Sequence, residues 1–321
     1  MKRDLKALIG QMTLEEKASL CSGSDFWHTQ GIERLGIPAV MVTDGPHGLR
    51  KQAGEADHLG LNDSVEAVCF PAGCATGSSF DPDLLEHMGQ VLGDECQAED
   101  VSILLGPAVN IKRSPLCGRN FEYMGEDPYL SSRMVVPYIE EVQKNGVAAC
   151  VKHFALYGAS ESGRDYNTMD MSRLRMYNEY LAPYKAAVDA GVGSIMSSFN
   201  IVDGIPATAN KWLLTDLLRN EWGFGGLLVT DYNSIAEMSS HGVAPLKEAS
   251  IRALQAGTDM DMVSCGFLNT LEESLKEGKV TEEQINAACR RVLEAKYKLG
   301  LFSDPYKYCD TLRTREKLYT A

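Results

Sequence analysis

Residues 222–232 read WGFGGLLVTDY: a glycine-rich turn, an apolar run, and then an acid and an aromatic residue, Asp231 and Tyr232. The apolar run is short and continuous, which predicts a strand buried on both faces, as in a parallel sheet. Functional side chains at the carboxyl end of such a strand are typical of a (β/α) barrel. Asp231 is therefore a candidate catalytic residue, although an acid at this place also often caps the next helix.

Other apolar runs repeat this pattern, and helical patterns separate them. The predicted strands are 38–43, 101–105, 148–152, 194–198, 226–230 and 258–262, with a weaker one at Cys69 and Phe70. The predicted helices are 83–98, 129–145, 172–190, 210–221 and 244–256. Strands that alternate with helices along the whole chain indicate a parallel α/β fold.

The polar residues that follow the strands favour one of the two common parallel folds. Asp44, Lys152, His153, Asn200 and Asp231 all stand at or just beyond strand ends. Polar residues at several strand ends favour a (β/α)8 TIM-like barrel, because a doubly wound sheet gathers its ligand contacts at one switch point. We predict one barrel domain over residues 1–302 and an irregular, polar tail over residues 303–321.

The composition excludes several classes of protein. A chain with 44% hydrophobic and 23% charged residues is an ordinary globular protein. The net charge of −13 argues against a nucleic-acid partner. No apolar run has the length of a membrane span, and the N-terminal residues lack the pattern of a signal peptide. We therefore expect a cytoplasmic protein with no membrane partner.

The nine cysteines and six histidines show no metal-binding or redox spacing. The odd number of cysteines and the absence of a C-x-x-C pair fit free thiols better than a disulfide framework or a zinc site. The histidines have no ligand spacing either. We expect neither a metal nor a cofactor.

Residues 222–232 resemble the nucleophile region of the family-three glycoside hydrolases, and further segments match that family in the right order. These segments are VTDGPHGLR at 42–50, CGRNFE at 117–122 with GEDP at 125–128, VKHF at 151–154, SSFN at 197–200 and WLLTD at 212–216. Any one of these motifs is unspecific, but their succession from about residue 40 to residue 235 is specific. The resemblance implies the first, barrel-shaped domain of these enzymes.

The resemblance also implies a role for each motif residue. Asp231 would be the nucleophile of a retaining, β-glucosidase-like enzyme that forms a covalent glycosyl-enzyme. Its place in the family motif puts Asp44, Arg119, Lys152 and His153 around the sugar. Phe199 and Tyr232 would complete the substrate-binding site.

The chemistry of these side chains suits a sugar or a β-glycoside as the small-molecule partner. An arginine fork can hold paired oxygens, and a carboxylate such as Asp44 accepts from two hydroxyls at once. Cations beside Asp231 would keep it ionised. Simpler interpretations remain open: Arg119 could pair with Glu122 or Glu126, and His153 could be a core histidine.

Two departures from the family pattern concern the acid/base and Phe199. Most β-glucosidase-like members take the acid/base glutamate from a second domain, and single-domain members carry a histidine on the loop that here reads ALYGASESGRDYN. Glu161 or Asp165 on this loop could supply the proton, but a solvated loop carboxylate is the plainer interpretation. Many relatives have tyrosine in place of Phe199, and without the hydroxyl that contact near the nucleophile is weaker. We expect weakened catalysis.

Rival hypotheses follow from the same features. The chain could be a sugar-binding barrel without turnover, and a lyase or aldolase would need Lys152 to form a Schiff base. The residues before about 145 and those after it resemble different branches of the family, which suggests an engineered, chimeric fusion of two half-barrels. The surface that a second domain would cover could also support self-association.

Overall fold

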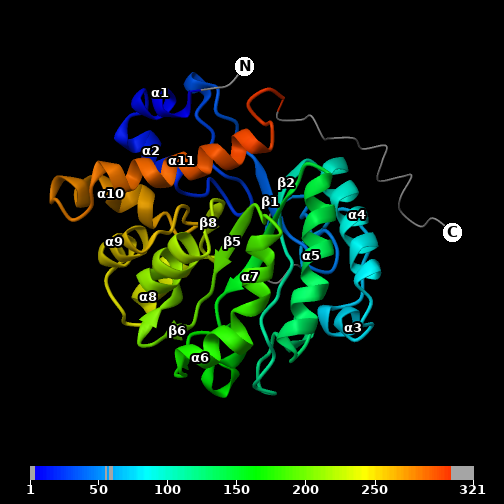
Figure 1. The fold of residues 1–321 in the computed structure, drawn as a ribbon. Helices are drawn as coiled ribbons and strands as arrows, with labels where there is room; N and C mark the ends of the chain where they lie inside the picture. The colour runs from blue at the N-terminus through cyan, green and yellow to red at the C-terminus, as the bar shows by residue number, and fades with distance from the viewer. Residues whose placement is uncertain (1–3, 55, 58–60, 305–321) are drawn as a thin grey trace.

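The computed structural model describes residues 4–54, 56–57 and 61–304. Its centre is a sheet of five parallel strands that lie side by side in chain order (Figure 1). The strands are β1 (Met41–Asp44), β2 (Val101–Leu105), β3 (Ala148–Phe154), β5 (Ser194–Ser197) and β8 (Leu227–Val229). A small second sheet holds β4 (Thr168–Met169), β6 (Ile201–Val202) and β7 (Ile205–Pro206). The predicted parallel α/β fold is confirmed.

Isolated backbone bridges continue the pairing beyond the main sheet. Val229 of β8 pairs in parallel with Met260, Asp261 pairs with Ser22, and His28 pairs with Met41 of β1. The predicted strand at 258–262 therefore contributes single bridges rather than a regular strand, and the weak candidate at residues 69–70 is coil. Among the described residues the main sheet has five regular strands, so the full (β/α)8 count is not established.

Helices cover the outside of the sheet. They are α1 (Leu5–Gly10), α2 (Leu14–Leu20), α3 (Gly73–Gly77), α4 (Pro82–Ala98), α5 (Pro128–Lys144), α6 (Arg173–Arg175), α7 (Ala182–Asp189), α8 (Ser234–Ser240), α9 (Leu246–Ala256), α10 (Gly266–Lys276) and α11 (Glu282–Lys298). Two segments, Met176–Tyr180 and Trp212–Glu221, are π-helical. Short 3-10 turns lie at Glu33–Leu35, Asn120–Glu122, Tyr157–Ala159, Glu161–Gly163 and Ala207–Ala209. No helix among the residues described is long and apolar enough to cross a membrane.

The sequence explains where the long helices α4 and α5 begin. Asp81 accepts hydrogen bonds from the first turn of α4, and Asp127 does the same for α5. A proline follows each cap, where its missing N–H costs nothing. Both helices return the chain from one strand end to the start of the next.

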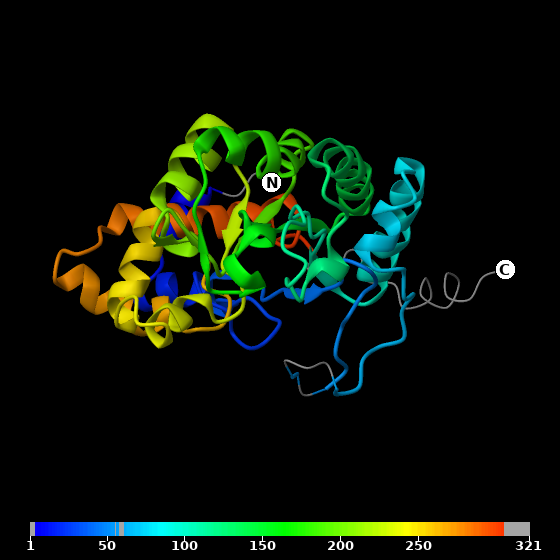
Figure 2. The same ribbon diagram turned by 90° about the horizontal axis from the view of Figure 1, so that it is seen from below.

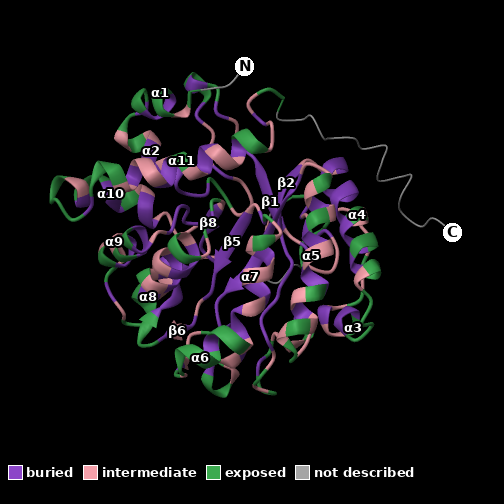
Figure 3. Ribbon diagram, in the orientation of Figure 1, coloured by how far each residue is buried: buried purple, intermediate pink, exposed green. Residues whose placement is uncertain are grey.

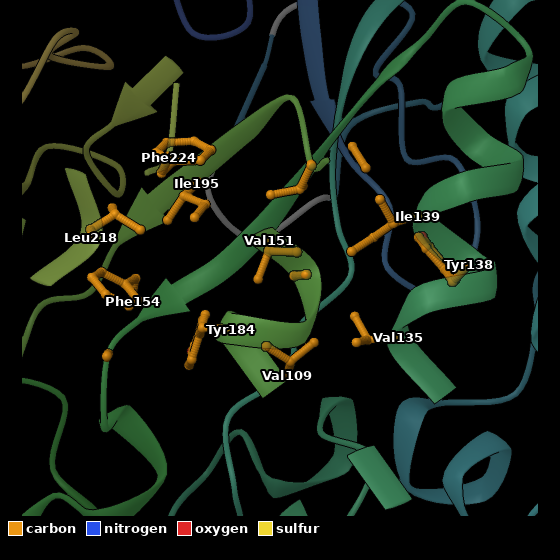
Figure 4. Close-up of a cluster of buried hydrophobic side chains, with 14 of the residues drawn as sticks. Val109, Val135, Tyr138, Ile139, Val151, Phe154, Tyr184, Ile195, Leu218 and Phe224 are labelled. Carbon is orange, nitrogen blue, oxygen red and sulfur yellow. The ribbon is translucent and has the colours of Figure 1, made fainter. Parts of the chain in front are cut away.

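Side chains of alternate strand residues pack into two separate apolar regions. Val151 and Ile195 point outward and pack with Tyr138, Ile139 and Tyr184 of the covering helices (Figure 4). Their neighbours along the strands point the other way, into a second cluster on the inner face of the sheet. That inner cluster is Val42, Ile103, Leu105, Leu227, Val229, Met260 and Met262, which enclose a void of only about 10 Å³. The strands are accordingly buried on both faces (Figure 3).

The first and last helices are joined by side chains far apart in sequence, and α1, α2 and α11 lie together at one side of the molecule (Figure 1). Lys17 Nζ lies 2.8 Å from Glu282 Oε1, and the Cys21 and Cys289 sulfurs are 3.5 Å apart. Lys296 Nζ, which is buried, donates to Thr29 Oγ1 at 2.9 Å and to the carbonyls of Gln30 and Pro38. Burial lowers the pKa of Lys296 to about 7.

The predicted tail and the nine cysteines lie only partly within the described residues. Of residues 303–321, the structure describes Ser303 and Asp304. The eight cysteines in the described part of the chain are free thiols, and Cys309 lies outside it.

Candidate active site

A cavity of about 150 Å³ opens at the carboxyl ends of the strands, and we call it the inner cavity. Its walls are Phe26, Trp27, Asp44, Arg50, Asp57, Leu105, Arg119, Lys152, His153, Met196, Asp231, Tyr232 and Met262. The described parts of the segment between β1 and α3 stand out from the edge of the molecule in Figure 2. The structure thus brings together six residues that the motifs predicted: Asp44, Arg119, Lys152, His153, Asp231 and Tyr232.

Asp231 stands just beyond β8 and has one oxygen engaged and one free. Its Oδ1 accepts a hydrogen bond from the Tyr232 N–H at 2.7 Å. Its Oδ2 lies 3.7 Å from His153 Nε2 and accepts no hydrogen bond from any described residue. Burial raises the pKa of Asp231 to about 6, against the opposing effect of Arg119 and Lys152. Above that pH the side chain is a buried carboxylate with one oxygen that accepts no hydrogen bond from the described residues.

Lys152 and Asp44 form a fixed ion pair across the cavity wall. Lys152 Nζ donates to Asp44 Oδ1 at 2.5 Å, and Arg50 lies 3.9 Å from the other Asp44 oxygen. Burial alone would raise the pKa of Asp44, but Lys152 outweighs burial and the pKa is lowered. The same pairing outweighs the effect of burial on Lys152 and raises its pKa. A lysine held in its charged form is a poor Schiff-base former, because that reaction needs the neutral amine.

Arg119 contacts both Glu122 and the cavity. Its Nε donates to the buried Glu122 carboxylate, and its guanidinium lies 5.6 Å from the centre of the Tyr157 ring. The predicted alternative, a salt bridge to Glu122, is therefore present. Because the pair uses Nε and Arg119 also lines the inner cavity, pairing and ligand binding are compatible.

His153 is held rigidly through its backbone while its ring remains unsatisfied. The Asn110 side chain accepts from the His153 N–H and donates to its carbonyl, both at 2.9 Å, and Tyr184 Oη donates to the same carbonyl at 2.6 Å. Among the described residues, His153 Nδ1 is buried without a partner. Burial, with Arg119 and Lys152 nearby, holds the pKa of His153 well below its usual value. The imidazole is neutral and can both donate and accept.

Three other predicted residues do not line the inner cavity. Phe199 packs against Tyr157 and Tyr166, with ring centres 6.2 Å and 5.0 Å apart. Glu161 and Asp165 are exposed on the loop after β3. Burial raises the pKa of Tyr157 and the nearby Asp165 adds to this effect, but the Asp165 carboxylate is not part of the cavity wall.

Several wall residues were not predicted from the sequence. Phe26 and Trp27 form an aromatic wall: the Phe26 ring lies 4.7 Å from Trp27 and 4.6 Å from Tyr232. Asp57 is a further carboxylate, but it accepts from Gln52 and from two backbone N–H groups of its own loop. The adjacent aromatic pair, Phe26-Trp27, was a usable signal, since such rings often floor a sugar site.

No group of three or more His, Cys, Asp or Glu side chains with a metal-binding arrangement occurs among the described residues. The site is instead an arrangement of charged and aromatic groups around a small cavity. Such an arrangement suits a neutral, hydroxyl-rich ring, which needs charged hydrogen-bond partners and an apolar surface to lie on.

Comparison with known proteins identifies the family. The model of the glycosyl hydrolase family 3 N-terminal domain matches residues 7–295. The chain is 46% identical over 298 residues to thermostable beta-glucosidase B of Acetivibrio thermocellus, covering 92% of this chain and 38% of that protein. It is 37% identical to an exo-alpha-(1->6)-L-arabinopyranosidase of Bifidobacterium breve, covering 94% of this chain and 38% of that protein.

A solved structure agrees with this match. The beta-glucosidase of Listeria innocua in complex with isofagomine superposes with a TM-score of 0.87 and 33% identity, over 100% of this chain and 49% of that one. The chain thus spans less than half the length of these relatives. One natural relative matches both sides of residue 145, so the comparisons give the chimera hypothesis no support. The chain belongs to glycosyl hydrolase family 3, through the N-terminal domain of that family.

Proposed function

We propose that this chain carries the nucleophile and the sugar pocket of a retaining β-glycosidase that acts on β-glucosides. The observation that carries the proposal is Asp231: a buried carboxylate at a strand end, with one oxygen hydrogen-bonded and the other without a described hydrogen-bond partner, in the wall of a cavity that cations also line. The beta-glucosidase among the relatives supports the choice of sugar. The arabinopyranosidase makes an α-L-arabinopyranoside the second substrate to try.

In this proposal the inner cavity holds one pyranose ring. The Asp44–Lys152 pair and Arg119 bind its hydroxyls, His153 adds a neutral partner, and Tyr232 offers an aromatic face. Asp231 Oδ2 attacks the anomeric carbon, the bond from that carbon to the leaving oxygen breaks, and the leaving oxygen takes up a proton. Water then hydrolyses the glycosyl-enzyme and releases the sugar.

The described residues of the site include no carboxylic acid that is clearly placed to donate a proton to the leaving group. A retaining enzyme places its acid about 5–5.5 Å from the nucleophile. Asp44 is held ionised by Lys152, and Asp57 is occupied by three donors. Glu161 and Asp165 remain candidates only if their loop moves. We infer that this chain alone acts best on glycosides whose leaving group needs no proton.

The proposed architecture is a closed, TIM-like barrel over residues 1–302. The bridges from Val229 to Met260, from Asp261 to Ser22 and from His28 to Met41 support closure, because they follow one another around the sheet. The inner cluster, to which strands on all sides contribute, supports it as well. A closed ring would aim every strand end into the inner cavity.

The alternative function is a sugar-binding barrel without turnover. The absence of a poised acid among the described residues is the observation that favours it. Both proposals predict sugar binding, and only the first predicts a covalent intermediate.

The test is the intact mass of the protein after incubation with an activated 2-deoxy-2-fluoro-β-glucoside, which needs little acid assistance. A single adduct on the wild type, located at Asp231 and missing from Asp231→Asn, supports the glycosidase. Bound glucose without any adduct at any pH between 5 and 8 would favour the binding protein. Lys152→Arg, which cannot form a Schiff base, is the control against the lyase hypothesis.

A further inference from the structure

Gln52 is a buried residue behind the wall of the inner cavity, with 5% of its surface exposed. Its side-chain oxygen accepts from Trp27 Nε1 at 3.2 Å and from the Asp57 N–H at 3.1 Å. Its Nε2 donates to Asp57 Oδ2 at 3.0 Å. Trp27 and Asp57 line the inner cavity, and Gln52 does not. One amide therefore joins two wall residues that come from different loops.

The backbone that carries Gln52 is fixed by pairing with the returning half of the same loop. Gln52 forms an antiparallel bridge with Ser64. Next to it, the Val65 N–H donates to the Lys51 carbonyl at 2.9 Å. The side-chain amide of Gln52 therefore extends from a hydrogen-bonded backbone, and it can hold its partners at a defined place.

The Trp27 ring needs such a partner to fix its orientation. The Val42 N–H of β1 donates to the Trp27 carbonyl at 2.8 Å, which fixes the backbone but leaves the side-chain torsions to other contacts. An indole N–H can only donate and a carboxylate can only accept, so the Gln52 amide has a single orientation that satisfies both Trp27 and Asp57. The oriented indole is part of the aromatic wall of the inner cavity.

We propose that Gln52 is a positioning residue, which holds the Trp27 ring and the Asp57 carboxylate in the wall of the inner cavity and thereby sets the affinity for the sugar. The inference rests on the proposed function and deepens it. Gln52 acts through its two partners and contacts no substrate. Trp27 lies against the sugar in the bound and in the reacting state alike, so a loss of its orientation raises KM and leaves kcat unchanged.

The first test is Gln52→Met, which keeps the length of the side chain and removes both polar atoms. KM for an aryl β-glucoside should rise roughly 3- to 10-fold, the range expected for one ring packed on an aromatic side chain, with kcat within about twofold of the wild type. Gln143→Met is the matched control. Gln143 also joins two loop groups, the Gly193 N–H at 2.7 Å and the Gly191 carbonyl at 3.2 Å, but it does not line the inner cavity, and its replacement should leave KM unchanged.

The second test reads the hydrogen bond itself, without turnover. The chain has three tryptophans, so a spectrum of the ¹⁵N-labelled indoles is simple, and Trp27→Phe identifies the Trp27 signal. In Gln52→Met the Trp27 indole proton should move upfield, because it loses its acceptor. The signals of Trp212 and Trp222 should stay in place.

A double-mutant cycle joins the two tests. Trp27→Phe keeps an aromatic ring and removes the N–H donor, so it should raise KM by a factor similar to that of Gln52→Met. The double variant should raise KM by clearly less than the product of the two single factors, because the second change removes a contact that is already lost. If Gln52→Met does not fold, Trp27→Phe tests the same hydrogen bond from its other end.

Wild-type KM in Gln52→Met or in Trp27→Phe overturns the positioning role, even when the indole signal moves. An unmoved Trp27 signal overturns the contact. Single factors that multiply in full, or equal effects of Gln52→Met and Gln143→Met on KM, kcat and melting temperature, would reduce Gln52 to a structural residue. A wild type that hydrolyses no glycoside and forms no adduct with the fluoroglucoside overturns the proposed function instead, and the calorimetric affinity for glucose then takes the place of KM.

Discussion

Two buried aspartates beside strand β8, Asp259 and Asp231, differ in how many hydrogen bonds their carboxylates accept. Asp259 lies against β8 and accepts from Arg219, Arg291 and the Leu228 N–H, at 2.5, 2.7 and 2.9 Å. Asp231 follows β8 and accepts from one backbone N–H, with its second oxygen free of described partners. Burial raises the pKa of both. Both oxygens of Asp259 accept hydrogen bonds from described residues, and one oxygen of Asp231 accepts none.

The largest effect that would test this contrast is expected in catalysis. Asp231→Asn should lower the hydrolysis of aryl β-glucosides roughly 10⁴-fold or more, since removing a nucleophile costs that much elsewhere. Steady-state rates with a nitrophenyl glycoside measure the loss. A fold-intact Asn variant with more than a tenth of the wild-type rate would contradict the role of Asp231.

Asp259 should instead contribute to the free energy of unfolding. Asp259→Ala leaves Arg219, whose side chain is 8% exposed, as an unpaired buried charge. Breaking a buried pair in this way costs about 3–5 kcal/mol of unfolding free energy. Urea denaturation measures it, with Asp216→Ala as the matched control, because the exposed Lys211–Asp216 pair should contribute less than about 1 kcal/mol. Equal costs would remove the distinction.

The burial of the Asp231 carboxyl group should make the wild type less stable as pH rises. The folded-state pKa is raised from 3.8 to about 6, so the folded protein binds more protons than the unfolded chain between these values. Stability is therefore lost as pH rises from about 4 to about 6. Asp231→Asn should match the wild type near pH 4 and exceed it by about 3 kcal/mol at pH 7. Denaturation at both pH values tests this, and a difference independent of pH would refute it.

Arg119 should show a smaller effect on the reaction, which appears in KM, together with a loss of stability because Glu122 is left as a buried carboxylate without its ion-pair partner. Arg119→Ala removes a charged donor from the inner cavity, a loss of about 1.5–3 kcal/mol, or roughly 10- to 100-fold in KM. Arg113→Ala, at an exposed arginine paired with Glu179, should leave KM unchanged. An Arg119→Ala protein with wild-type KM and melting temperature would remove Arg119 from the sugar site.

Phe199 should have the smallest effect of all. It packs on Tyr157 and Tyr166 rather than on the inner cavity. Phe199→Leu should therefore change KM for aryl glucosides less than about twofold, because the change keeps an apolar side chain at a position that does not line the inner cavity. A larger change would show that Phe199 acts on the substrate after all.

The strands were easier to predict than the elements between them. The buried strand Val101–Leu105 was predicted with both its ends, because continuous apolar runs mark strands covered on two faces. The segment 258–262 forms single bridges instead of a strand, which hydrophobicity cannot distinguish. Helix α3 contains two glycines and α10 begins with one, and the predicted pattern therefore missed both.

The site residues at strand ends could be predicted from the sequence, and those on loops could not. Asp44, Lys152, His153 and Asp231 stand at strand ends, where a parallel fold gathers them. Phe26, Trp27 and Asp57 come from long loops, whose paths depend on tertiary contacts that no local pattern encodes. The sequence predicted the two cations beside Asp231 but not the burial that raises its pKa to about 6, because depth of burial cannot be read from sequence.

The hydrogen bonds from Lys296 to Thr29, Gln30 and Pro38 also have a consequence for biosynthesis. Pro38 leaves the ribosome 258 residues before its partner. At 5–20 residues per second, this delay is about 13 to 50 seconds. During that time the segment that supplies Phe26 and Trp27 has no helix α11 to close against. The nascent chain must therefore complete its aromatic wall after most of the strands have been made, and a chaperone that shields residues 5–40 would act in that interval.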